Sequence, residues 1–170
     1  MGLVGKELKV LVNASPLILL AKAGLLNILR ELFGEVWTTR EVWSEVLWPL
    51  RHGISSPDAE AVRACNWVKV VDLTEEEREK LKDYMGRLGI DPREASLAAV
   101  YPRGFDLIIT ADREAEEALT GEGFKVMDLS KLIILAGRRG LLDVREAAKR
   151  IWDAGYRTEE IEALMSGRAP

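Results

Sequence analysis

Short apolar segments rich in β-branched residues alternate with helical segments along the chain, and this alternation restricts the fold more than any other feature. The clearest strand is Phe105–Thr110, whose unbroken apolar run is typical of a parallel strand covered on both faces. The other predicted strands are Leu8–Val12, Val36–Thr38, Trp67–Val71 and Phe124–Met127. Because parallel strands need crossover connections, we expect a parallel sheet with helices on both faces.

Several helix boundaries are predicted from capping residues. Ser15 precedes Pro16, which suits an N-cap followed by proline at the first helical position. Thr39 is a second expected N-cap, and Pro49 lies near the end of the helix that follows it. Three helices are expected to close the chain: Leu129–Arg138, Val144–Ala154 and Thr158–Met165.

Length and composition favour a single domain. The chain has 170 residues, of which 48% are apolar, so one hydrophobic core of ordinary size is expected. We place the core of this domain at about residues 8–140 and a helical extension at 141–170. A single Cys excludes an internal disulfide and fits a reducing compartment, which predicts a cytoplasmic protein. Frequent Glu, Arg and Lys without Gln lean towards a thermophile.

Charge and hydropathy argue against nonspecific binding to nucleic acid and against a membrane-spanning segment. The net charge of −4 gives the whole chain no attraction for nucleic acid, so RNA binding would need a local basic face. The most apolar stretch, Val10–Leu29, is interrupted by Asn13, Pro16, Lys22 and Gly24, so no membrane span is expected. The glycine-rich segment Gly2–Gly5 precedes the first strand, whereas a dinucleotide loop would follow it.

Polar residues that follow the predicted strands are the first candidates for a site. Asn13 follows the first strand and Asp112 follows Phe105–Thr110, at the sheet edge where ligands of parallel α/β proteins bind. Asp112 is either an ordinary N-cap or a metal ligand. Glu94 either closes a capping box with Asp91 or projects from the helix face that packs on the sheet. A buried carboxylate of the second kind must be paired, protonated or bound to a cation.

The helix after Thr39 offers two acidic candidates. Periodicity alone favours Glu45 as a surface residue, although one choice of apolar stripe places it at the edge of the buried face. Glu41, one turn away, competes with it. The single His52 and Cys65 cannot form a zinc site of the usual kind, and we interpret both as structural. The five tryptophans are expected mostly in the core or at an interface, although such residues can stack on bases.

Taken together, these segments resemble the PIN-domain family, and specifically its toxin-like branch related to VapC ribonucleases. The order and spacing of the segments match over about residues 8–140. The segments that carry the resemblance are Val12–Lys22, Leu26–Trp37, Val42–Val46, Asp91–Ala95 and Asp106–Arg113. The resemblance implies a three-layer α/β/α sandwich with a five-stranded parallel sheet, followed here by extra C-terminal helices.

The resemblance also implies a site. Members typically hold Mg²⁺ or Mn²⁺ with three or four acidic residues and cut RNA, and hard cations of this kind prefer oxygen ligands. Glu45, Glu94 and Asp112 match the family's catalytic acids, and Asn13 falls where most members have an Asp. Neutral Asn13 can still coordinate through its amide oxygen, but metal affinity should fall. Ser15 and Thr110 would support the ligands by hydrogen bonds.

Three functions are compatible with the sequence. The leading hypothesis is a divalent-metal-dependent ribonuclease of the toxin type, with an RNA substrate, an antitoxin partner and a homodimeric state implied by the resemblance. The second is a catalytically weak PIN-like module that binds RNA or protein, which the neutral Asn13 motivates. The third, an unrelated small-molecule binder, is disfavoured by the missing phosphate loop and by the acidic residues.

Overall fold

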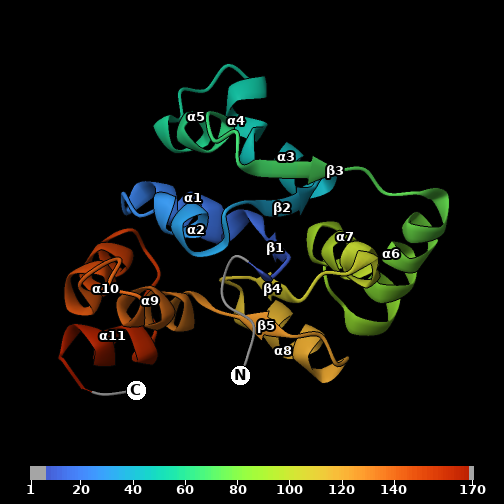
Figure 1. Ribbon diagram of the computed structural model, residues 1–170. Coiled ribbons are helices and arrows are strands. Elements are labelled where there is room, and N and C mark those ends of the chain that lie inside the picture. The colour runs from blue at the N-terminus through green and yellow to red at the C-terminus, as the bar shows by residue number, and fades with distance from the viewer. Residues whose placement is uncertain (1–6, 169–170) are drawn as a thin grey trace.

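The computed structural model describes residues 7–168, and its centre is a five-stranded sheet (Figure 1). All strand pairs are parallel and the strand order is β3-β2-β1-β4-β5. The strands are β1 Val10–Val12, β2 Val36–Thr39, β3 Val68–Val71, β4 Leu107–Ile109 and β5 Val126–Met127. The predicted parallel α/β fold is therefore confirmed, with most strands shorter than their apolar runs.

Helices flank both sides of the sheet (Figure 1). In the view of Figure 1, α1, α2 and α9–α11 lie to the left of the strands, α6 and α7 lie to the right, and α8 lies below β5. The helices are α1 Ala14–Lys22, α2 Asn27–Phe33, α3 Arg40–Val46, α4 Trp48–Arg51, α5 Pro57–Arg63, α6 Glu75–Leu88, α7 Pro92–Val100, α8 Arg113–Gly121, α9 Leu129–Arg138, α10 Val144–Asp153 and α11 Glu159–Met165. A short 3₁₀ turn, η2 Tyr101–Arg103, follows α7.

The central strands β1 and β4 form the middle of the core. Their pairing places Leu11 beside Ile108, and both side chains are completely buried. Strand β1 also pairs with β2 on its other edge. The chain runs from β1 to β2 on one side and reaches β4 on the other, so β1 is the point where the winding direction changes. In open parallel sheets, ligands bind outside the carboxyl ends of the strands at such a point.

The start of α1 differs from the prediction. Asn13, not Ser15, is the N-cap: its backbone is extended and its Oδ1 accepts a hydrogen bond from the Ala14 amide at 2.8 Å. Ser15 lies within the first turn, and its buried Oγ has no hydrogen-bond partner. Pro16 is tolerated there because first-turn amides lack intrahelical partners.

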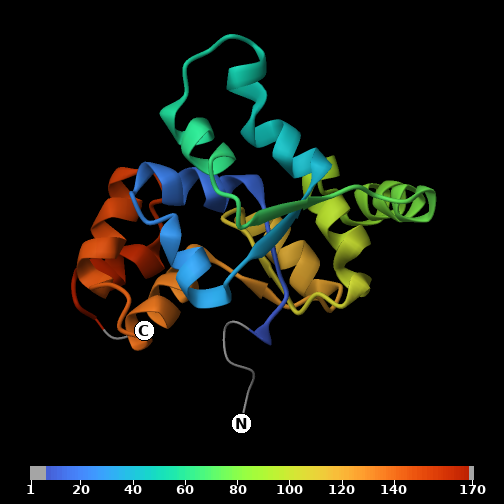
Figure 2. The ribbon, with the colours of Figure 1, turned by 45° about the horizontal axis from the view of Figure 1, so that its top comes forward.

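The predicted helix after Thr39 is also divided. Helix α3 ends at Val46, and Pro49 lies in the first turn of the separate short helix α4 instead of ending the longer helix. Helix α4 and the loop that leads to α5 stand away from the sheet at the top of the molecule (Figure 2). Helix α5 returns to pack against α1.

The C-terminal helices bury their apolar faces within the chain. Helix α10 packs on α9, α11 and α1, and its Ile151 is completely buried, as is Ile161 of α11. Arg113 of α8 adds an exposed ion pair with Glu160 of α11 at 3.2 Å. Within residues 7–168, none of the helices combines the length and the apolar character needed to cross a bilayer.

Candidate functional site

A hydrogen-bonded group joins the carboxyl ends of β1 and β4. The Asn13 amide nitrogen Nδ2 donates to the Thr110 hydroxyl at 3.3 Å, and the backbone amide of Asp112 donates to the same hydroxyl at 3.3 Å. Asn13 and Thr110 are buried, whereas Asp112 is exposed. The Asp112 Oδ1 also accepts from the Ala115 amide at 3.0 Å, which makes Asp112 the N-cap of α8. Thr110 therefore fixes the positions of Asn13 and Asp112 relative to each other.

A second hydrogen-bonded chain joins the end of β2 to the start of α7. The hydroxyls of Thr39 and Ser96 lie 2.6 Å apart, and the Ser96 hydroxyl donates to the carbonyl of Arg93 at 2.7 Å. Because the single hydroxyl proton of Ser96 is donated to that carbonyl, Thr39 is the donor in the Thr39–Ser96 hydrogen bond. Both hydroxyls are completely buried. They hold the first turn of α7, and with it Glu94, against the carboxyl edge of the sheet.

Glu94 is a buried carboxylate with an oxygen that nothing in the described chain satisfies. The residue is 6% exposed, and its Oε2 has no hydrogen-bond partner. The N-cap of α7 is Asp91, whose Oδ1 accepts from the Glu94 amide at 3.1 Å, and α7 shows none of the reciprocal capping box found in α6. Of the two sequence interpretations, the structure favours the carboxylate that faces the interior. Such a group is costly unless a cation or proton accompanies it.

Two further buried oxygens lack partners within residues 7–168, and they lie in comparable positions. Ser15 Oγ belongs to the first turn of α1 and Glu41 Oε1 to the first turn of α3. Glu94 is likewise in the first turn of α7. Helix α3 packs against both α1 and α7. Helical periodicity left open which acid of this helix faces the interior, and the structure buries one carboxylate oxygen of Glu41 while Glu45 stays exposed.

Glu45, in contrast to these buried oxygens, is exposed and paired. Its side chain is 46% exposed, and its Oε1 lies 2.8 Å from Nη1 of Arg93. Arg93 also donates through Nη2 to Asp91 Oδ2 at 2.5 Å, and these carboxylates, Asp91 foremost, raise the pKa of the guanidinium. Exposed pairs of this kind contribute about 0–1 kcal/mol, so the Glu45–Arg93 pair is a weak restraint.

The structure brings some predicted residues together and leaves others apart. Asn13, Thr110 and Asp112 form one bonded group, and Glu94 is held at the same edge of the sheet by Thr39 and Ser96. Across the described residues, no cluster of three or more His, Cys, Asp or Glu side chains is arranged to hold a metal ion. The three acids Glu45, Glu94 and Asp112 therefore do not form a ready-made ligand cage.

The oxygen donors nevertheless suit a hard cation. Mg²⁺ needs only one or two carboxylates in an open site because it keeps several of its waters. The unbonded Oε2 of buried Glu94 is the observation that fits such an ion best. Asn13 is less available, because its Oδ1 already caps the Ala14 amide.

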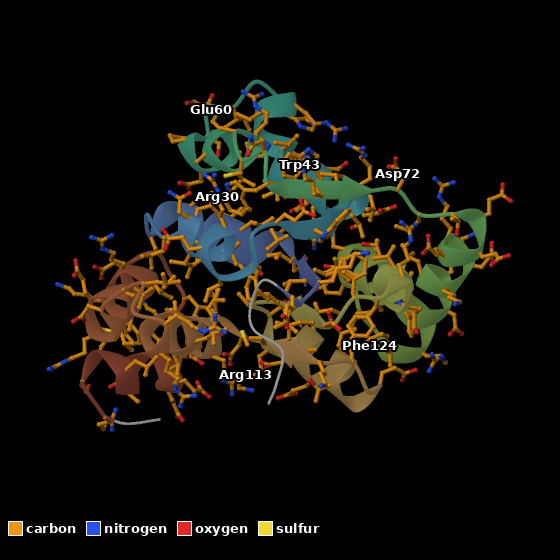
Figure 3. The ribbon with its side chains drawn as sticks, viewed as in Figure 1. Arg30, Trp43, Glu60, Asp72, Arg113 and Phe124 are labelled. Carbon is orange, nitrogen blue, oxygen red and sulfur yellow. The ribbon has the colours of Figure 1, made fainter. Side chains whose placement is uncertain are left out.

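A separate charged group supports the fold at the end of β3, where Figure 3 labels Asp72. Arg103 donates to the Asp72 carbonyl at 2.7 Å and to both carboxylate oxygens of Glu77. Hydrogen bonds from Arg103 are the main reason that the pKa of Glu77 falls to about 2. Glu77 also completes the capping box of α6 with Thr74. This group joins α6 to η2 and is structural.

The fold is that of an open parallel α/β domain with polar side chains at the carboxyl edge of its sheet. The sequence matches the model of a family described as DUF3368, PIN domain, over residues 9–163. This chain therefore belongs to the PIN-domain family, whose members are generally nucleases that use divalent metals. The match extends well into the C-terminal helices.

A solved structure agrees with the fold. PAE2754 from Pyrobaculum aerophilum superposes with a TM-score of 0.54 at 21% sequence identity, over 76% of this chain and 90% of that chain. This likeness concerns the fold alone. Among curated proteins, none matches the sequence.

Proposed function

We propose that this protein is a divalent-metal-dependent ribonuclease of the VapC toxin type that hydrolyses phosphodiester bonds in RNA. The observation that carries the proposal is Glu94, a buried carboxylate with an unbonded oxygen at the start of α7. A bound cation would remove the cost of that burial. Membership of the PIN-domain family supports the same function at the level of nuclease.

The proposed metal ligands are side-chain oxygens from four element ends: Asn13, Glu45, Glu94 and Asp112. Ser15 and Thr110 would support them, Thr110 through the hydrogen bonds that it already makes to Asn13 and Asp112. Mg²⁺ or Mn²⁺ at these oxygens would supply charge stabilisation and activation of water for in-line attack on a phosphodiester. The protein's own contribution is to fix the positions of Asn13, Asp112 and the first turn of α7 through the buried hydroxyls of Thr110, Thr39 and Ser96.

Glu45 would have to leave Arg93 to take part. Because the pair is half-exposed, breaking it costs about 1 kcal/mol or less, which is small beside the gain from metal binding. Glu41 is the competing acid of α3, since its Oε1 is buried without a partner. The single variants Glu45→Gln and Glu41→Gln distinguish the two acids. Substitution of the acid that binds the metal weakens Mn²⁺ binding, and substitution of the other leaves it unchanged.

The decisive test is calorimetric titration with Mn²⁺ beside cleavage of an end-labelled single-stranded RNA. We expect metal binding and metal-stimulated cleavage in the native chain, and loss of both in the double variant Glu94→Gln/Asp112→Asn. The matched control is Glu79→Gln on α6, whose side chain is 76% exposed. The proposal is wrong if the native protein binds no Mn²⁺ at millimolar concentration.

A second candidate is a PIN-like module with little or no catalytic activity that binds RNA or protein. Three observations favour it: Asn13 is neutral, Glu45 is paired with Arg93, and the acids of residues 7–168 form no cluster of three. Retention of RNA binding without metal binding or cleavage would establish this alternative.

We also propose a homodimer and an antitoxin partner, both implied by the toxin-type resemblance. Helices α10 and α11 already bury their own apolar faces within the chain, so these contacts are expected outside the C-terminal helices. Light scattering that finds only monomer at high concentration would contradict self-association.

A further inference from the structure

Trp48 differs from the other tryptophans of the chain. Trp37, Trp43, Trp67 and Trp152 all pack in or against the hydrophobic core. Trp48 belongs to the short helix α4 and is 49% exposed. A large aromatic side chain that contributes little to the core and stays half in solvent is available to contact a ligand.

The Trp48 ring stacks on the ring of its neighbour one turn on, His52. The rings of Trp48 and His52 are stacked with centroids 4.1 Å apart and planes 23° apart. His52 Nδ1 lies 2.8 Å from the Trp48 carbonyl oxygen, which ties the imidazole to the same turn. The result is a stacked pair of aromatic rings on an exposed helix, in which the face of Trp48 away from His52 is a platform for a base to stack on.

The platform lies beside the acid that is proposed to act on RNA. Trp48 and Glu45 line two hollows in common, one of about 510 Å³ and one of about 580 Å³. These volumes fall within the range of small-ligand sites, about 300–1,000 Å³. The first hollow is lined by Lys22 together with the acids Glu45 and Asp58. The second is lined by Arg51 and Arg93 together with Glu41 and Glu45, and Arg93 is already paired with Glu45 and Asp91. Lys22 and Arg51 are therefore the basic side chains beside the aromatic face that are placed to contact the phosphates of a single strand.

We infer that Trp48, backed by His52, stacks an unpaired base of single-stranded RNA adjacent to the cleavage site. The inference rests on the proposed ribonuclease function and names the residue that would contact an unpaired base, because a base in a duplex cannot reach a side chain in this way. Stacking accepts any base, so Trp48 sets the requirement for a single strand more than a sequence preference.

The test is the affinity of the full-length chain for a labelled 12-nucleotide single-stranded RNA, measured by fluorescence anisotropy in EDTA at low salt. We expect Trp48→Ala to weaken binding roughly 5- to 100-fold, the effect of losing one stacked base. Trp48→Phe keeps an aromatic face and should stay close to the native affinity. Trp48→Leu keeps apolar area without an aromatic face and should resemble Trp48→Ala.

The matched control is Ile54→Ala, which removes an equally exposed apolar side chain on the adjoining loop. It should leave RNA affinity unchanged. Native affinity in Trp48→Leu, or no RNA binding by the native chain, would overturn the inference. So would a change from dimer to monomer in Trp48→Ala and Ile54→Ala with RNA affinity intact, because the surface would then be a subunit contact.

Failure of the stacking site is distinguishable from failure of the nuclease. Mn²⁺ titration and cleavage assays on the same native preparation report on the nuclease alone. Metal-dependent cleavage with RNA affinity insensitive to Trp48 refutes only the stacking site. Affinity that depends on Trp48 without metal binding or cleavage supports the stacking site and refutes the nuclease.

Discussion

Replacing Glu94 with Gln should change the stability of the protein in opposite directions with and without metal. Gln has nearly the same shape as Glu but carries no charge. In EDTA at pH 7, the native chain holds the buried Glu94 carboxyl group, 6% exposed and with Oε2 unbonded, without any cation. Because the Gln amide also lacks partners there, the relief is partial, about 1 kcal/mol of the ~1–3 kcal/mol that burial of an unpaired polar group costs.

That free energy corresponds to a melting temperature about 2–4 °C higher for Glu94→Gln in EDTA, given the usual scaling for a chain of this size. Added Mn²⁺ should reverse the order. At 100 times its dissociation constant, a ligand stabilises the native state by about 2.7 kcal/mol, and only the native chain should gain this. Differential scanning fluorimetry at pH 7, with EDTA and then with a Mn²⁺ series, measures both effects.

The reversed order of the two melting temperatures on adding Mn²⁺ is what distinguishes a metal ligand from a structural residue. If Glu94 served the fold, Glu94→Gln would melt below the native chain in EDTA as well, and the reasoning from its unbonded oxygen would be refuted. Glu79→Gln is the control, because a side chain that is 76% exposed should change stability by about 0.5 kcal/mol or less in either condition.

Three further predictions concern the supporting residues. Thr110→Val should lower the free energy of unfolding in urea by about 1–3 kcal/mol, because Asn13 Nδ2 and the Asp112 amide lose their acceptor, whereas Thr110→Ser should not. Asn13→Asp should tighten Mn²⁺ binding about tenfold by calorimetry through its added charge, and unchanged affinity would place residue 13 outside the metal shell. The pKa of Glu77, lowered to about 2 mainly by Arg103, predicts a contribution of about 1–3 kcal/mol that is complete above the unfolded pKa of 4.5 and is lost as pH falls towards 2. The difference in unfolding free energy between the native chain and Glu77→Gln should therefore shrink between pH 5 and about pH 2, and a constant difference would contradict the ion pair.

Local sequence rules were sufficient for the sheet and for one part of the site. The apolar runs predicted all five strands, and their alternation with helices predicted parallel pairing, because burial on both faces is visible in a continuous apolar run. Asn13 and Asp112 were located because polar residues after buried strands lie at the carboxyl edge in any parallel sheet. Capping chemistry was less reliable at Ser15, where the preceding Asn13 makes the cap.

The tertiary structure decided the questions that local patterns left open. Whether Glu94 caps its helix or faces the interior depends on how α7 packs against the end of β2. That packing includes the hydrogen bond between Ser96 and Thr39, which are 57 positions apart in the sequence. Glu45 is exposed and forms an ion pair with Arg93 of another helix. Trp48 is exposed because α4 is separate from α3 and stands away from the sheet. Helical periodicity assigns residues to faces, but only the packing of distant elements determines which face meets the core, a charge or water.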